Sequence, residues 1–175
     1  MLGKRTKALF REHTLEIADF MVNLETKWIK ETGAELIPEE ALEARHHSPA
    51  RWKVQLRQNA QRITHFIEPD GLFALKFPDK PNEEIGVILE VDRGTMPVTR
   101  KSLQRSSIQR KLLAYETLWK QGFFKRTYGW KRVRVLFVVT SASRTKNIQE
   151  ILKRHSNAYQ LFQFHSPEKN PTCSP

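Results

Sequence analysis

"IGVILEVDRG", residues 85–94, is an apolar run that ends in acidic residues and a glycine. Its aliphatic and β-branched side chains predict a buried strand that Gly94 ends. Side chains alternate across a strand, so Glu90 and Asp92 share one face with Ile88. Carboxylates in such a setting are costly unless they are paired or bind a cation, and ligand sites gather at strand C-termini. We therefore expect a functional site at this end of the strand.

The segments on either side predict further strands and helices. Apolar residues at helical spacing predict helices over residues 12–32, over 101–122 and up to about residue 155. Strand patterns fill 62–77, in two short runs broken at Pro69-Asp70-Gly71, and also 132–140 and 158–164. The polar stretch 38–52 is expected to be a loop or a short helix.

This order of elements predicts an α/β fold with a mixed central sheet flanked by helices. A hairpin, a crossover helix and a further buried strand also resemble the αβββαβ core of restriction-endonuclease-like, PD-(D/E)xK nucleases. We expect residues 1–165 to form a single nuclease-like domain. Residues 166–175 are rich in Pro and Ser, and we expect a disordered tail there.

The composition favours a polyanionic partner. The chain of 175 residues carries a formal net charge of +11, which favours nucleic acid through counterion release; an acidic protein is the alternative. It contains no run of about 18 apolar residues that would predict a membrane span, and no apolar segment typical of a signal peptide. A single cysteine, Cys173, rules out a disulfide framework within the chain. A cytoplasmic location is expected.

Three acidic residues suggest metal chemistry. Asp70, Glu90 and a backbone carbonyl such as that of Val91 would form an oxygen-rich site, which suits Mg²⁺ or Mn²⁺. Such an ion would promote attack on a phosphodiester. The alternatives are that Asp70 is only a turn residue, and that Glu90 and Asp92 pair with Arg93 or Arg62.

Three sequence segments together resemble the plasmid replication-relaxation family. They are PDGLFALKF (69–77), ILEVDRGTMP (88–97) and QRKLLAYE (109–116), and the resemblance extends over about residues 13–151. It implies a role in replication or relaxation of plasmid or other mobile DNA, with DNA and replication or relaxation proteins as partners. Members of that family typically carry an N-terminal winged-helix segment, for which this sequence has no room, so we expect a truncated relative or an excised domain.

The resemblance to PD-(D/E)xK nucleases has one departure. Those enzymes place a lysine two residues after the glutamate, where this chain has Asp92. Some branches carry Gln-x-x-x-Tyr on the following helix, and Lys111-x-x-x-Tyr115 resembles that pair with lysine in place of glutamine. We therefore predict a migrated lysine and a catalytic set of Asp70, Glu90, Asp92 and Lys111, with Tyr115 as a possible addition. The alternative is that Lys111 is an exposed cation on a DNA-facing helix.

Other charged residues are secondary candidates. Glu16, one turn after His13, is a candidate additional metal ligand, or else a solvated helix acid, and Arg93 is a further cation beside the acids. The residues expected to contact phosphates are Arg100, Lys101, Arg110, Lys125, Arg126, Lys131 and Arg144. Tyr128 and Trp130 lie between basic residues and are candidates for stacking on exposed bases.

Three functions fit these observations. The first is a metal-dependent DNA endonuclease or nickase, favoured by the presence of both Asp70 and Glu90. The second is a catalytically degenerate nuclease fold that binds DNA as an accessory factor, favoured by Asp92 at the lysine position. The third is a protein–protein adaptor with a basic face. Divalent-cation binding separates the first from the others, and steep salt dependence of DNA binding separates the first two from the third.

Overall fold

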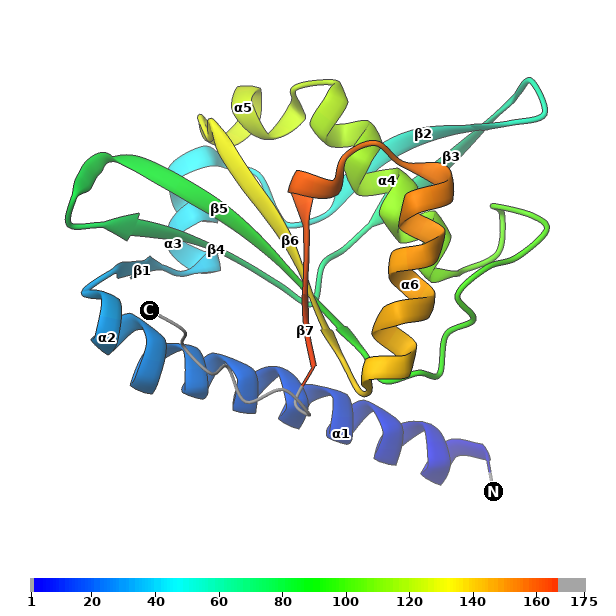
Figure 1. The fold of residues 1–175 in the computed structure, drawn as a ribbon, viewed down its shortest axis with the longest axis horizontal. Coiled ribbons are helices and arrows are strands. Elements are labelled where there is room, and N and C mark those ends of the chain that lie inside the picture. The colour runs from blue at the N-terminus through cyan, green and yellow to red at the C-terminus, as the bar shows by residue number, and fades with distance from the viewer. Residues whose placement is uncertain (1, 167–175) are drawn as a thin grey trace.

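The computed structural model describes residues 2–166 and contains a five-stranded mixed sheet flanked by helices (Figure 1). The strand order is β1-β4-β5-β6-β7, with antiparallel pairs up to β5 and parallel pairs from β5 to β7. The strands of this sheet are β1 (Glu35–Ile37), β4 (Gly71–Phe77), β5 (Lys80–Asp92), β6 (Arg132–Val139) and β7 (Phe162–His165). The predicted α/β class with a mixed central sheet is confirmed.

The two faces of the sheet are covered by different helices. One face packs against α4 (Ile108–Lys120) and α6 (Ala142–His155), and Ile88 of β5 lies in that core. The other face, which includes Leu89 and Val91, packs against the long N-terminal helix. Successive side chains of β5 thus point to opposite faces of the sheet, as expected for a strand.

The N-terminal helix begins earlier than predicted. It is continuous through α1 (Leu2–Asn23), a π-helical turn η1 (Leu24–Ile29) and α2 (Lys30–Thr32). Gly33 ends it with a φ of +65°, a conformation that glycine adopts without steric cost. The expected end of the helix is thus confirmed, whereas its expected start at residue 12 is ten residues late. None of the helices described in residues 2–166 is both long and apolar enough to cross a bilayer.

The hairpin β4–β5 and the crossover through α4 to β6 position the site. Because β5 and β6 are parallel, their C-terminal ends, Asp92 and Val139, lie side by side. The backbone N–H of Asp70 donates to the carbonyl of Leu89 at 3.0 Å, which extends the β4–β5 pairing by one residue. Asp70 is therefore brought to the end of β5 that carries the other two acids.

A second, two-stranded sheet was not predicted. It is formed by β2 (Trp52–Gln58) and β3 (Gln61–Ile67). The two runs expected on either side of Pro69-Asp70-Gly71 thus belong to different sheets. The first, β3, pairs with β2, which precedes it in the chain, and the second, β4, pairs with β5, which follows it. Within the stretch expected to be polar loop or short helix, the structure has α3 (Glu39–His46) and the first residue of β2.

Smaller differences concern element ends. The second helix begins at Ile108 rather than near residue 101, because the hydroxyl of Ser107 accepts from the N–H of Arg110 and caps it. A short helix α5 (Phe123–Tyr128) follows it, and the 3₁₀ turn η2 (Tyr159–Leu161) takes the first part of the last expected strand. Ser166 is buried, and the rest of the expected tail, 167–175, lies outside the described residues.

Candidate active site

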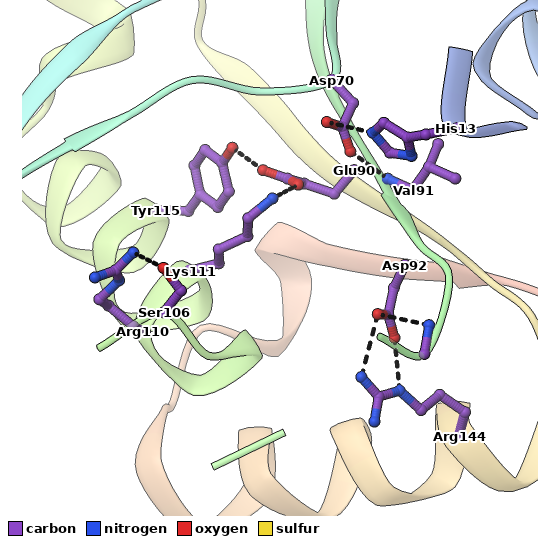
Figure 2. A network of polar contacts seen from close by, with 11 residues as sticks. His13, Asp70, Glu90, Val91, Asp92, Ser106, Arg110, Lys111, Tyr115 and Arg144 are labelled. Carbon is purple, nitrogen blue, oxygen red and sulfur yellow. Dashed lines mark hydrogen bonds and ion pairs between the residues drawn. The ribbon is translucent and has the colours of Figure 1, made fainter. Parts of the chain in front are cut away.

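An open cleft of about 440 Å³ lies at the C-terminal end of β5. Its lining comes from α1, the residue before β4, the end of β5, the loop after it, α4 and β6 (Figure 2). Among the lining residues are four that the sequence placed together, Asp70, Glu90, Asp92 and Lys111. Its size is within the range of ligand-binding pockets.

Glu90 is at the centre of the polar contacts. Its side chain is only 2% exposed, and each carboxylate oxygen accepts a hydrogen bond from α4. The Lys111 ammonium donates to Oε2 and the Tyr115 hydroxyl donates to Oε1 (Figure 2). Lys111 and Tyr115 are four residues apart, so they lie on the same face of the helix. The structure therefore brings the Lys-x-x-x-Tyr pair directly to the glutamate.

Burial controls the protonation of this group. It raises the pKa of Glu90 to about 7; the Lys111 charge opposes that rise and the nearby Asp70 adds to it. Burial lowers the pKa of Lys111, but the charges of Glu90 and Asp70 outweigh it, so the pKa lies above its usual value. Burial, followed by the charge of Glu90, raises the pKa of Tyr115, which keeps the phenol a hydrogen-bond donor. Near neutral pH, Glu90 is close to its own midpoint of ionisation.

Asp70 is fixed by two different elements. Its Oδ2 accepts from the backbone N–H of Val91 on β5 at 2.8 Å, and its Oδ1 lies 3.1 Å from Nε2 of His13 on α1. Both contacts are to the side chain, so Asp70 does more than form a turn. His13 also lines the cleft. His13 was not predicted as a site residue, because a single histidine on a helix is a weak signal in a sequence.

Asp92 has a partner that the sequence did not suggest. Arg144, at the start of α6, donates from Nε to Oδ2 at 2.7 Å and from Nη2 to Oδ1 at 3.1 Å. Figure 2 shows the Asp92 carboxylate directed toward α6, apart from the Glu90 group. The alternative pairing of Glu90 and Asp92 with Arg93 or Arg62 is therefore wrong. Arg144 had been expected to contact phosphate, and here its side chain is 17% exposed.

Glu16 and Arg93 pair with each other. Nε of Arg93 lies 3.3 Å from Oε1 of Glu16, and the guanidinium also contacts Glu12, both on α1. Arg93 lines the cleft, whereas Glu16 is not among its lining residues. The ion pairs attach the end of β5 to the N-terminal helix.

The basic residues expected to contact phosphates do not form one surface. Arg100 and Lys101 lie in the loop after β5, and Arg110 lies at the start of α4 beside Lys111, which lines the cleft. Those on α5 and before β6, Lys125, Arg126 and Lys131, lie at the N-terminal end of β6, opposite the acids (Figure 1). The expected set therefore divides between the two ends of the sheet.

The expectation that Tyr128 and Trp130 stack on exposed bases is wrong. Both side chains are buried, and their rings stack on each other with centroids 4.5 Å apart. Trp130 also lies over Gly86 of β5, where a Cβ atom would come within 2.0 Å of the indole. These aromatic residues belong to the core.

The carboxylates can be compared with what a divalent cation requires. Across residues 2–166, no three or more His, Cys, Asp or Glu side chains are grouped so that they could hold a metal ion. Asp70 and Glu90 nevertheless line the same cleft with hard oxygen atoms. Mg²⁺ commonly takes one or two carboxylates and completes its shell with waters and substrate phosphates. The donor set therefore fits Mg²⁺ or Mn²⁺ shared with a phosphate, but not an ion enclosed by protein ligands.

The chain matches a model of a known protein family. The family model described as replication-relaxation matches residues 2–133, which is most of the chain. The match includes Asp70, Glu90, Lys111 and Tyr115 and ends before α6, so Arg144 lies outside it. No curated protein and no solved structure matches the chain.

Proposed function

The chain belongs to the replication-relaxation family, and on this premise we propose that it is a metal-dependent endonuclease or nickase of plasmid or other mobile DNA. The family supports a role in replication or relaxation of such DNA. The observation that carries the nuclease proposal is the convergence of Asp70, Glu90 and Lys111 on one cleft. The arrangement resembles a PD-(D/E)xK site whose lysine comes from α4 instead of from the position of Asp92.

Each residue has a distinct part in this proposal. Asp70 and Glu90 would hold Mg²⁺ or Mn²⁺, which when bound polarises a phosphate oxygen and makes a bound water more acidic. His13 and the backbone of Val91 hold Asp70 in place. The Tyr115 hydroxyl holds Glu90 by donating to Oε1, the carboxylate oxygen that Lys111 does not contact.

Lys111 supplies positive charge where the reaction needs it. Its side chain is 23% exposed and lines the cleft, so its ammonium can reach a phosphate while remaining close to Glu90. Hydrolysis adds water across one P–O ester bond: the water oxygen joins phosphorus, and the departing oxygen takes a proton. A fixed cation stabilises the negative charge that develops at the phosphate. Asp92 has a positioning role in this proposal: Arg144 donates a hydrogen bond to each of its oxygens, and the pair holds the end of β5 against the start of α6.

The test is cleavage of supercoiled plasmid with Mg²⁺ or Mn²⁺. We expect nicking or linearisation by the wild type, and a loss of about 10²-fold or more in Asp70→Asn, Glu90→Gln and Lys111→Met. Glu150→Gln is the matched control, because Glu150 is an exposed residue of α6 outside the cleft. Calorimetric titration with Mn²⁺ reports on the ligands separately from catalysis, and Asp70→Asn and Glu90→Gln should weaken this binding.

A second function is favoured by Asp92 at the usual lysine position. In this case the chain is a nuclease-like fold that binds DNA as an accessory factor without cutting it. Absence of cleavage by the wild type, with salt-sensitive DNA binding equal in all variants, would support this function and rule out the first.

A further inference from the structure

The β2–β3 hairpin extends away from the body of the molecule (Figure 1). The turn between its strands is Asn59-Ala60, with φ values of +50° and +65°, as in the two-residue turns that suit twisted hairpins. One face of the hairpin is apolar, and Trp52, Val54 and Leu56 are buried in the core that includes α4. The packing of this face fixes which residues the opposite face presents to solvent.

The outer face of the hairpin, defined here as Lys53, Gln55, Arg57, Arg62, Thr64 and Phe66, contains no acidic residue. Its cross-strand pairs are Lys53 with Phe66, Gln55 with Thr64 and Arg57 with Arg62. Two arginines directly opposite one another destabilise a hairpin. In the described part of the chain, neither arginine nor Lys53 has a carboxylate within ion-pair distance. A polyanion lying across this face would remove the repulsion.

Phe66 adds an aromatic surface to this basic face. The residue is 59% exposed, the guanidinium of Arg51 lies 4.9 Å from its ring centroid, and Arg51 also pairs with Glu68 at 3.0 Å. Proteins that bind single-stranded nucleic acid combine cations for the backbone with exposed aromatic rings for the bases. The outer face of the hairpin has both components.

The outer face leads toward the cleft. β3 spans seven residues, about 20 Å, and Asp70 follows its last residue, Ile67, by three positions. Phe66 and Ile67 also line a hollow of about 130 Å³ between β3 and α4, and Lys111 borders both this hollow and the cleft. At the tip of the hairpin, the Gln58 amide donates to the Lys101 carbonyl at 2.8 Å. This bond holds the loop after β5, which carries Lys101, against the tip.

We propose that the outer face of the hairpin docks a single DNA strand and leads it to the cleft at Lys111. Arg57, Arg62 and Lys53 contact phosphates, and Phe66 stacks on an unpaired base. The inference rests on the proposed function only in taking DNA as the ligand, and it holds whether or not the site cuts.

The test is binding of a fluorescent 20-nucleotide single strand to the full chain in EDTA, measured by anisotropy at several salt concentrations. Arg57→Gln/Arg62→Gln should weaken binding at least tenfold and flatten the salt dependence by about 1.4 in the log–log slope, since each lost phosphate contact removes about 0.7. Phe66→Ala should weaken binding about fivefold or more, and Phe66→Trp should restore it.

Lys27→Gln/Lys30→Gln is the matched control, because it removes the same charge from the helix on the other face of the sheet. It should bind within twofold of the wild type. Wild-type binding with unchanged affinity and slope in the hairpin variants would overturn this inference and leave the proposed function standing. No DNA binding by the wild type would overturn both. Equal affinity of the wild type for polyglutamate would instead indicate an acidic protein partner and overturn the docking of DNA.

Discussion

At the residue scale, Glu90 is a buried carboxylate whose ionisation is decided by burial and by its two hydrogen-bond partners on α4. Removing this group from water disfavours its charge, and the hydrogen bonds from Lys111 and Tyr115 offset only part of that cost. The group therefore ionises near neutral pH. In the metal-dependent function proposed above, a cation bound beside Glu90 would favour its ionised form.

The raised pKa of Glu90 predicts how stability changes with pH. A carboxyl whose pKa rises from 4.5 to about 7 on folding stabilises the folded state fully below pH 4.5, and this contribution is lost as pH rises through 7. The full change is about 3 kcal/mol in the free energy of unfolding. Glu90→Gln cannot ionise, so its stability relative to the wild type should rise by about that amount between pH 4.5 and 8. Denaturant unfolding across this range measures it.

Glu150→Gln is the control for this prediction, because it removes a carboxyl that is exposed and lies outside the cleft. A Glu90→Gln difference from the wild type that does not change between pH 4.5 and 8 would mean that Glu90 ionises in the folded protein much as it does in water.

Part of the site could be predicted at this scale from residues close in sequence. Glu90 and Asp92 could be assigned to one strand face, and Lys111 and Tyr115 to one helix face, because strand and helix periods fix those directions. The Arg144 contact with Asp92 joins residues 52 positions apart and depends on how α6 docks. No local period encodes such a contact, and the same holds for His13 and Asp70, which are 57 positions apart.

At the element scale, the Asp92–Arg144 pair connects the end of β5 to the start of α6. Both side chains are largely buried, and Arg144 also donates to the carbonyl of Met96 in the following loop. Breaking such a pair leaves an uncompensated buried charge. Asp92→Ala and Arg144→Ala should therefore each lower the free energy of unfolding by about 3 kcal/mol, as measured by denaturant titration.

The double variant tests whether the two residues act as one unit. Asp92→Ala/Arg144→Ala should cost clearly less than the sum of the single changes, because no charge is then left unpaired. Strict additivity would show that the contact contributes little and that each residue acts through other neighbours.

The errors in predicting elements have identifiable causes. β2 has a clear alternation, with Trp52, Val54 and Leu56 buried and the residues between them exposed, but its polar residues and the preceding histidines and proline masked that pattern. The turn signal at Pro69-Asp70-Gly71 correctly marked the end of one strand and the start of another. Whether two such strands pair with each other depends on distant partners, which a turn signal does not specify.

At the scale of the whole molecule, the excess positive charge has a spatial pattern. Lys111 lines the cleft at the C-terminal end of β5, whereas Lys125, Arg126 and Lys131 lie at the N-terminal end of β6, the opposite end of the sheet. β6 alone spans eight residues, or about 26 Å. A ligand that reaches from one end to the other must therefore be a long one.

This separation predicts that DNA length decides which cations matter. If Lys125, Arg126 and Lys131 contact phosphates as expected, their replacement by glutamine should weaken binding of a 40-nucleotide strand several-fold and flatten its salt dependence. A 4-nucleotide strand extends over roughly 14 Å at about 3.4 Å per nucleotide, which is about half the length of β6, so a strand of this length held at the cleft cannot reach them. Anisotropy titrations of both strands with the wild type and the triple variant measure the difference. An equal loss for the two lengths would place the three cations on the same binding path as the cleft, and no loss for either would make them ordinary solvated surface.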